Sequence, residues 1–158
     1  MKLSNELNES INEQILHEYH NALIYAQIQS YFEDTQLKNI AEYFKKQSVH
    51  ETEHAQKFIQ HLNDRTGGKV SIGEVDSPNL NLSSVESVGE VYISTEQGTT
   101  ESIEEIYELA SDTKSFIDLP FLLEMLSEQV EEEDVANEFS LKLKNTKDLV
   151  LFDSSLEE

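Results

Sequence analysis

The sequence predicts an all-α protein built as a bundle of four long helices. Apolar residues recur at steps of three and four along most of the chain, which is the period of an amphipathic helix. Turn-like segments divide this pattern into four long stretches. Each stretch also carries one glutamate near the middle of its apolar stripe: Glu18, Glu51, Glu96 and Glu132.

Length and composition limit the classes of protein to which the chain can belong. With 158 residues it is expected to form one domain, residues 1–158, with a sizeable core. Its net charge of -21 disfavours nucleic acid and anionic membrane surfaces and attracts cations. The absence of cysteine excludes thiolate metal sites. No segment has the pattern of a signal peptide or of a membrane span, so we expect a cytoplasmic protein with neither nucleic acid nor membrane as a partner.

The first two helices are expected over residues 5–33 and 36–66. Ser4 is suited to cap the first, because its side chain can accept a hydrogen bond from the first turn. The second should end before Gly67 and Gly68, a pair that commonly stops a helix. The short turn between the two stretches makes the helices antiparallel neighbours.

The stretch from Lys69 to Ser83 lacks the helical period. A single strand would have no partner in an otherwise helical chain, so we expect an extended crossover. The period resumes over residues 84–112 and again over 119–146, where Pro120 suits a first helical turn. One long connection between the second and third helices, with short turns elsewhere, is a known topology for four-helix bundles.

The buried glutamates require a positive partner. An ionised carboxylate in an apolar interior costs many kcal/mol unless it is paired or coordinates a cation, and this chain has few basic residues. His54 lies three residues after Glu51, so the two side chains share one helix face. A bridging carboxylate beside an imidazole suits iron or manganese. The pattern therefore predicts a dimetal site inside the bundle.

Each candidate also has a simpler interpretation as a surface residue. A lone ExxH pair is weak support for metal, because such pairs are common on acidic helix surfaces. Its place on an apolar stripe between Phe44 and Phe58 favours the metal site. Periodicity alone places Glu96 inward or outward equally well. In the acidic run EQVEEED most side chains are expected to be solvated, while the helical phase selects Gln129 and Glu132 as the inward pair.

Five segments of the chain together resemble the non-haem bacterial ferritins. They are HEYHNALIY, HETEHAQKF, TGGKVSIGEVDSP, EQGTTESIEEIYELA and EQVEEE, and they cover nearly the whole length. The resemblance implies a ferritin-like bundle with one long crossover between helices two and three, assembled into a hollow 24-subunit cage. It also implies ferroxidase activity, in which dioxygen oxidises Fe(II) at a di-iron centre within each subunit and Fe(III) mineral is stored in the cage.

The resemblance assigns roles to residues of the four helices. The two irons would share Glu51 as a bridge. The first iron would also take the first-helix glutamate and the histidine of the ExxH pair, and the second would take glutamates of the third and fourth helices. Tyr25 matches a tyrosine beside the centre that hydrogen-bonds a ligand or supplies an electron. The implied metal set is Glu18, Glu51, His54, Glu96, Glu132 and, beside it, Gln129.

The chain also departs from the family. Bacterial members hold a third iron, which by resemblance would use Glu128, Glu131 and Glu132 with a second-helix glutamate, but here His50 stands in that last place. No haem is expected, since neither methionine occupies the haem-ligating position. Asp118 and Glu124 are candidates for the acidic threefold channel of the cage, although Leu119 and Leu122 interrupt the pattern expected there.

The C-terminal segment and the function leave alternatives open. The family's fifth helix should follow the segment KDLVLFDSSLEE, which is residues 147–158 and ends the sequence. We therefore expect the fifth helix to be short or truncated. One alternative function is a di-iron or manganese carboxylate oxidase that does not store iron. The other is a non-catalytic acidic helical protein that binds a basic partner.

Overall fold

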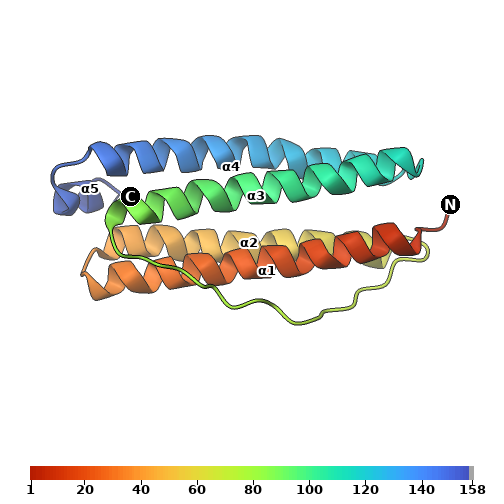
Figure 1. Cartoon of the computed structure of the whole chain (residues 1–158), viewed down its shortest axis with the longest axis horizontal. Helices are drawn as coiled ribbons and strands as arrows, with labels where there is room; N and C mark the ends of the chain where they lie inside the picture. The colour runs from red at the N-terminus through yellow and green to blue at the C-terminus, as the bar shows by residue number, and fades with distance from the viewer. Residues whose placement is uncertain (157–158) are drawn as a thin grey trace.

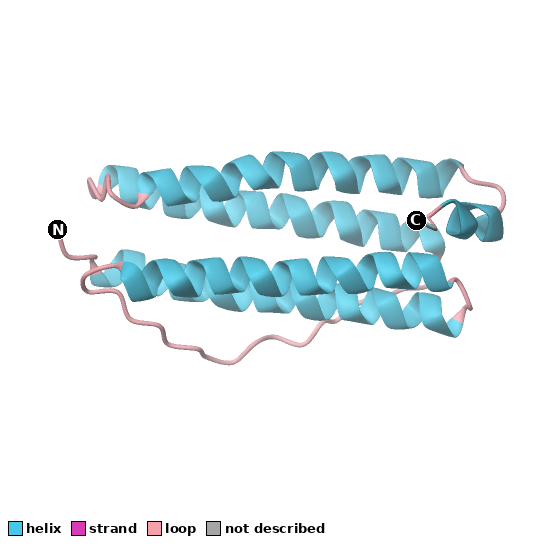
Figure 2. Cartoon of the chain, turned by 180° about the vertical axis from the view of Figure 1, so that it is seen from behind, coloured by secondary structure: helices cyan, strands magenta, loops and turns pink. Residues whose placement is uncertain are grey.

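Four long helices and one short helix make up the structure. The computed structural model describes residues 1–156, and all of its regular secondary structure over that range is helical (Figure 1, Figure 2). The prediction of an all-α four-helix bundle with one long crossover is confirmed. The helices are α1 (Asn5–Asp34), α2 (Lys38–Asp64), α3 (Val85–Asp112), α4 (Leu119–Asn145) and α5 (Leu149–Ser155).

The long helices form two antiparallel pairs. Helix α1 packs along α2 and α3 packs along α4, while α1 also contacts α3. The connection over residues 65–84 runs the length of the bundle on its outside, so α3 is parallel to α2 (Figure 1). Side chains of α1 hold this extended segment, because Asn8 Oδ1 accepts from Lys69 N (2.8 Å) and Asn12 Oδ1 accepts from Ser71 N (2.7 Å).

A polar layer at the middle of the bundle divides the apolar core into two clusters. The cluster near α5 is rich in aromatic residues, and in it Phe32 and Phe44 stack with ring centroids 6.0 Å apart. The cluster at the other end is mainly aliphatic and includes Ile11, Ile15 and Leu62. Apolar burial in these clusters drives folding and encloses the layer from both ends of the bundle. The polar layer comprises the buried side chains Glu18, Glu51, His54, Glu96 and Gln129.

Local caps define where the long helices begin. Ser4 Oγ accepts from Leu7 N at 3.2 Å, so the predicted cap of α1 is confirmed. Ser84 and Ser87 form a reciprocal capping box at the start of α3, which satisfies two backbone donors that the helix itself cannot. Gly67 follows α2 with φ of 84°, a left-handed conformation that favours glycine and turns the chain into the crossover.

Helix α5 confirms the expectation of a short fifth helix, although it lies within KDLVLFDSSLEE rather than after it. The helix lies inside that segment, whose last two residues, 157 and 158, are outside the described range. Phe152 packs against Phe139 with ring centroids 5.5 Å apart, and Asp153 Oδ1 accepts from Ile40 N (2.8 Å) in the first turn of α2. With only seven residues, α5 is too short to show a helical period, and contacts with the bundle hold it in place.

Asp118 is buried at the end of the bundle that is opposite α5. Its carboxylate accepts from Arg65 Nε (2.6 Å) and Ser115 Oγ (2.6 Å), and lies 2.8 Å from His61 Nε2. Burial alone would raise the pKa of Asp118, but these hydrogen bonds outweigh it and hold the pKa below its ordinary value. The network ties α2 to the turn before α4. Asp118 is therefore held in a structural ion pair with Arg65.

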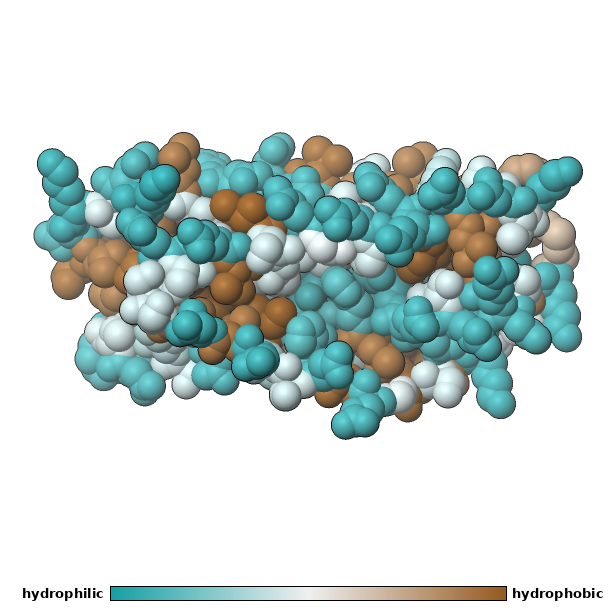
Figure 3. All heavy atoms as spheres, in the orientation of Figure 1, coloured by the Kyte–Doolittle hydropathy of each residue, from teal (hydrophilic) through white to brown (hydrophobic). Residues whose placement is uncertain are grey.

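The outer surface is strongly hydrophilic. Figure 3 shows hydrophilic side chains over most of the face formed by α1, α3 and the crossover, with hydrophobic patches between them. Across residues 1–156, every helix falls short of the combined length and apolarity that crossing a bilayer requires.

Candidate metal centre

The polar layer brings together acidic and imidazole side chains from three helices. Glu18 comes from α1, Glu51 and His54 come from α2, and Glu96 comes from α3; each is 0% exposed. Glu51 and His54 share a helix face because they are three residues apart. Glu18 falls in phase with the buried residues of α1. Glu18, Glu51 and His54 point inward as expected, and Glu96, whose orientation the period left open, is buried in the same layer.

Glu18, Glu51 and His54 form a compact group. One donor atom from each lies within 4.8 Å of the others. His54 Nδ1 is 3.4 Å from Glu51 Oε2 and 3.9 Å from Glu18 Oε2. Buried polar atoms are normally hydrogen-bonded, yet several potential metal-ligand atoms here have no hydrogen-bond partner. The unpartnered atoms of this group are Glu18 Oε2, both carboxylate oxygens of Glu51 and both ring nitrogens of His54.

The electrostatics of the layer favour a cation. Burial raises the pKa of Glu18 and Glu51 well above the ordinary value, because removal from water penalises the charged form. The negative charge of Glu51 raises the pKa of Glu18 further, and that of Glu96 acts in the same way on Glu51. Burial also raises the pKa of Glu96. A divalent cation that displaces the protons would supply the missing positive charge.

Glu96 differs from the other carboxylates because its orientation is fixed. The Tyr25 hydroxyl donates a hydrogen bond to Glu96 Oε1. Gln129 Nε2 donates to Glu96 Oε2 (3.2 Å) and to the Glu96 backbone carbonyl (3.2 Å). Burial, followed by the negative charge of Glu96, raises the pKa of Tyr25 well above its ordinary value, so the phenol stays protonated and donates. Tyr25 and Gln129 therefore position a candidate ligand.

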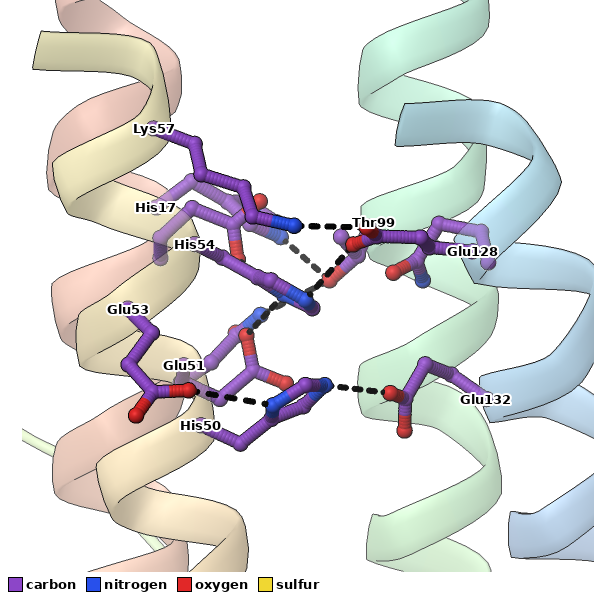
Figure 4. A network of polar contacts seen from close by, with 12 residues as sticks. His17, His50, Glu51, Glu53, His54, Lys57, Thr99, Glu128 and Glu132 are labelled. Atoms are coloured by element: carbon purple, nitrogen blue, oxygen red, sulfur yellow. Dashed lines mark hydrogen bonds and ion pairs between the residues drawn. The ribbon is translucent and has the colours of Figure 1, made fainter. Parts of the chain in front are cut away.

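Glu132 lies at the edge of the layer and is bonded to His50. His50 Nε2 and Glu132 Oε1 are 2.6 Å apart, and Figure 4 shows the two side chains meeting between α2 and α4. The hydrogen bond to Glu132 is the main cause that raises the pKa of His50, and Glu53 contributes as well. His50, His54 and Glu132 also place donor atoms within 4.8 Å of one another. The structure thus places Glu132 with the histidines of α2 rather than with Glu96.

The other helix-four candidates have separate surroundings. Glu128 Oε2 is 3.1 Å from His54 Nε2, while Glu128 Oε1 accepts from Lys57 Nζ at 2.6 Å (Figure 4). Glu131 is exposed on α4. Of the candidates for a third iron, the structure therefore brings Glu128, Glu132 and His50 to the edge of the polar layer and leaves Glu131 in solvent.

Sequence reasoning missed a set of polar residues behind Glu18. Gln14 Nε2 donates to Glu18 Oε1 at 3.0 Å, and Gln14 lies four residues earlier on the same face, a spacing that could have indicated the contact. Asn21 Nδ2 and His17 Nε2 both reach Thr99 Oγ1, at 2.7 Å and 3.0 Å. Burial lowers the pKa of His17, and the charge of nearby His20 adds to this effect. Asn21 and His17 therefore tie α1 to α3 beside the polar layer.

Comparison with known proteins identifies relatives of the whole chain. A family model described as a ferritin-like domain matches residues 8–145. A bacterial non-heme ferritin of Staphylococcus aureus (strain USA300) is 32% identical over 133 residues, which is 84% of this chain and 80% of the relative. The one of Staphylococcus haemolyticus (strain JCSC1435) is 30% identical over 131 residues, with 83% and 78% covered.

Solved structures extend the similarity to the fold. An open pore ferritin from the archaeon Archaeoglobus fulgidus superimposes with a TM-score of 0.93 at 30% identity, and 98% of each chain is covered. A variant of PmFTN, in a crystal soaked in iron, superimposes with a TM-score of 0.89 at 27% identity, with 96% of this chain and 98% of that chain covered. The similarity therefore includes the crossover and the C-terminal region as well as the four long helices.

Proposed function

The chain belongs to the ferritin family, and on that premise we propose that it oxidises Fe(II) with dioxygen and stores the Fe(III) product as mineral. The observation that supports this most strongly is the set of fully buried, unpartnered oxygens of Glu18 and Glu51 next to His54. A purely structural layer would satisfy these atoms with hydrogen bonds. A protein that only binds a basic partner at its surface would have no use for buried carboxylates.

In this proposal the polar layer holds two substrate irons. Glu18, Glu51 and His54 would bind the first. Glu51, which has both oxygens free, would bridge to a second iron bound by Glu96. Glu132 would complete the second position by turning away from His50. Gln129 then serves to orient Glu96 rather than to bind iron, because its amide nitrogen faces that carboxylate.

The residues of the layer suit the chemistry of Fe(II) oxidation. Each Fe(II) gives up one electron and dioxygen accepts both, so the site must stabilise the added positive charge of two Fe(III) ions. Carboxylate oxygens are hard ligands and suit that charge. The apolar clusters on either side keep bulk water out of the layer. Because few of the ligands are nitrogen atoms, Fe(III) would be bound weakly enough to leave the centre for storage.

Storage requires assembly, and we propose that the chain forms a cytoplasmic cage of 24 subunits. Support comes from its ferritin relatives and from exposed apolar side chains outside the core. Leu23 on α1, Val49 on α2 and Ile72 on the crossover are 42%, 53% and 53% exposed. Contact with further copies of the chain would remove these side chains from water.

The proposal is tested by substitution of the bridge. Glu51→Gln keeps the shape of the side chain and removes its charge, so the fast phase of Fe(II) oxidation, followed by near-ultraviolet absorbance in a stopped-flow instrument, should slow by at least about 100-fold. Glu53→Gln is the matched control, because Glu53 is exposed on the same helix.

Two outcomes would contradict parts of the proposal. Oxidation by Glu51→Gln at the rate of the Glu53→Gln control would refute the centre. Rapid oxidation by a wild-type protein that elutes from a sizing column as a single subunit would support a non-storing oxidase instead of a cage.

A further inference from the structure

A polar groove lies on the surface between α1 and α3. Its volume is about 390 Å³, and α1 contributes Glu13, Gln14 and His17 to its lining while α3 contributes Ser102 and Glu105. Figure 3 shows both hydrophilic and hydrophobic side chains on the face that α1 and α3 form, and Ile106 and Leu109 are also part of the lining. The groove is on the face away from the α2 and α4 edge that Figure 4 displays. It is separate from the candidate ligands, none of which lines it.

A single side chain separates the groove from the polar layer. Gln14 lines the groove, is only 2% exposed, and donates through Nε2 to Glu18 Oε1 at 3.0 Å. The other oxygen of Glu18 is buried and unpartnered. Rotation of the Gln14 amide would therefore open the groove directly onto a carboxylate that lacks a positive partner.

His17 presents a nitrogen lone pair beside Gln14. Thr99 has one hydroxyl hydrogen, which it donates to the Thr95 carbonyl (3.0 Å). Thr99 Oγ1 must then accept from Asn21 Nδ2 (2.7 Å) and from His17 Nε2 (3.0 Å). In the neutral imidazole the hydrogen is thus on Nε2, and Nδ1 carries the lone pair that a metal ion needs.

The charge at the groove attracts cations. Glu13 and Glu105 are exposed at its rim, and neither lysine nor arginine is among the residues that line it. The α2 and α4 edge is less open to cations, because Lys57 forms an ion pair with Glu128 there and His50 is bonded to Glu132. At the groove, by contrast, Glu13 and Glu105 form no ion pair with a lysine or arginine among the lining residues.

We propose that this groove binds hydrated divalent cations and is an access route for Fe(II) to the centre, with Gln14 as its gate. Glu13 and Glu105 gather the ion, His17 and the groove hydroxyls replace part of its water shell, and displacement of Gln14 passes it to Glu18. The inference rests on the proposed function, because it supplies the substrate of the same centre.

The test removes charge from the groove without touching a ligand. The double variant Glu13→Gln, Glu105→Gln should lower the oxidation rate at subsaturating Fe(II) by about tenfold, since loss of a focusing charge slows cation association. The number of Fe(II) ions that the centre binds at anaerobic equilibrium should stay at the wild-type value, because neither residue is one of its ligands. Glu9→Gln, Glu108→Gln is the matched control, because both residues are exposed on the same two helices outside the groove.

A second pair of variants tests whether the open volume of the groove is needed for oxidation. Ser102→Trp should fill it and slow oxidation, whereas Ser111→Trp, exposed near the end of α3, should not. Rates equal to those of the controls in both experiments, with normal anaerobic binding, would overturn the access route and leave the centre intact. If the wild-type protein binds no Fe(II) without oxygen, the proposed function itself fails, and this inference with it.

Discussion

Carboxylates of the same chemical type differ in how tightly their surroundings hold them. Glu96 accepts hydrogen bonds from Tyr25 and Gln129, which fix both of its oxygens. Glu51 has no hydrogen bond to either oxygen, so its carboxylate is free to reorient. Glu18 is intermediate, with one oxygen held by Gln14 and one free. A di-iron centre needs both kinds of ligand, because fixed groups position the ions and mobile groups follow the change in charge.

The imidazole of His54 should matter for one iron more than for the other. His54→Ala removes the nitrogen ligand of the group formed with Glu18 and Glu51, while Glu96 keeps its partners. We expect the number of Fe(II) ions bound per subunit under anaerobic conditions to fall from two to about one, because a lost ligand weakens affinity by a factor of about 100 or more. Isothermal titration measures this count.

His20→Ala is the control for that experiment. His20 lies on α1, and its ring bonds to the Asp76 carbonyl (2.7 Å) outside the layer. It should bind iron as the wild type does. Unchanged binding in both variants would remove His54 from the centre.

Sequence analysis found the inward residues but not their partners. The phase of each apolar stripe indicated that Glu18 and Glu51 point into the bundle, because moving them outward would expose the stripe. The bond between His50 and Glu132 joins residues 82 positions apart, and that between Lys57 and Glu128 joins residues 71 apart. Such contacts depend on how the helices pack, and a period along one helix carries no information about them.

At the scale of elements, the long helices could be placed from the sequence, whereas the expected short fifth helix could not be placed correctly. A helix such as α1, with 30 residues, repeats its apolar pattern over many turns, so the period is evident. Helix α5 has only seven residues and none that is fully buried. Its position is set by packing of Phe152 on the aromatic cluster and by the bond from Ile40 to Asp153. These causes lie outside the segment itself.

The bond between α5 and α2 should contribute measurable stability. Leu37 gives α2 no side-chain cap, so the Ile40 amide depends on Asp153 Oδ1 at 2.8 Å. Asp153→Ala should lower the free energy of unfolding by about 1 kcal/mol, as loss of a helix cap does. Urea unfolding of the metal-free protein measures it, and hydrogen exchange at the Ile40 amide should become faster.

Asp153→Asn serves as the conservative comparison. It keeps an oxygen acceptor at the same place and should restore most of the protection. Equal exchange at Ile40 in all three proteins would show that α5 does not cap α2.

At the scale of the whole molecule, the bundle trades stability for a charged interior. The chain has a net charge of -21, and three of the glutamates that contribute to it are enclosed between the two apolar clusters. Repulsion among these groups opposes the compact state. The clusters at either end supply the apolar burial that holds the layer together without a cation. The residues that lower the stability of the bundle are the ones that would bind the substrate, which is typical of functional sites.

This arrangement predicts an unusual pH dependence for the metal-free protein. Burial raises the pKa of Glu18, Glu51 and Glu96 above the ordinary value of 4.5, so above that pH the folded state binds more protons than the unfolded state. These three groups make stability fall as pH rises toward neutrality, the raised pKa of His50 adds to the fall, and the lowered pKa of His17 opposes it. Asp118 does not oppose this trend, because its lowered pKa gives a contribution that is complete above 3.8 and is lost only at lower pH.

Urea midpoints measured from about pH 5 to about pH 7.5 test the sign of this dependence. Glu51→Gln should flatten the decline, because one of the groups that takes up a proton on folding is gone, whereas Glu42→Gln, which removes an exposed carboxylate of the same helix, should keep the wild-type slope. A saturating divalent cation such as Co(II) should also reduce the decline, since it binds the ionised carboxylates of the folded state and stabilises that state by mass action. A midpoint that rises with pH in the metal-free wild type, or a slope that Glu51→Gln and Glu42→Gln change equally, would mean that the buried carboxylates do not control the stability of the bundle.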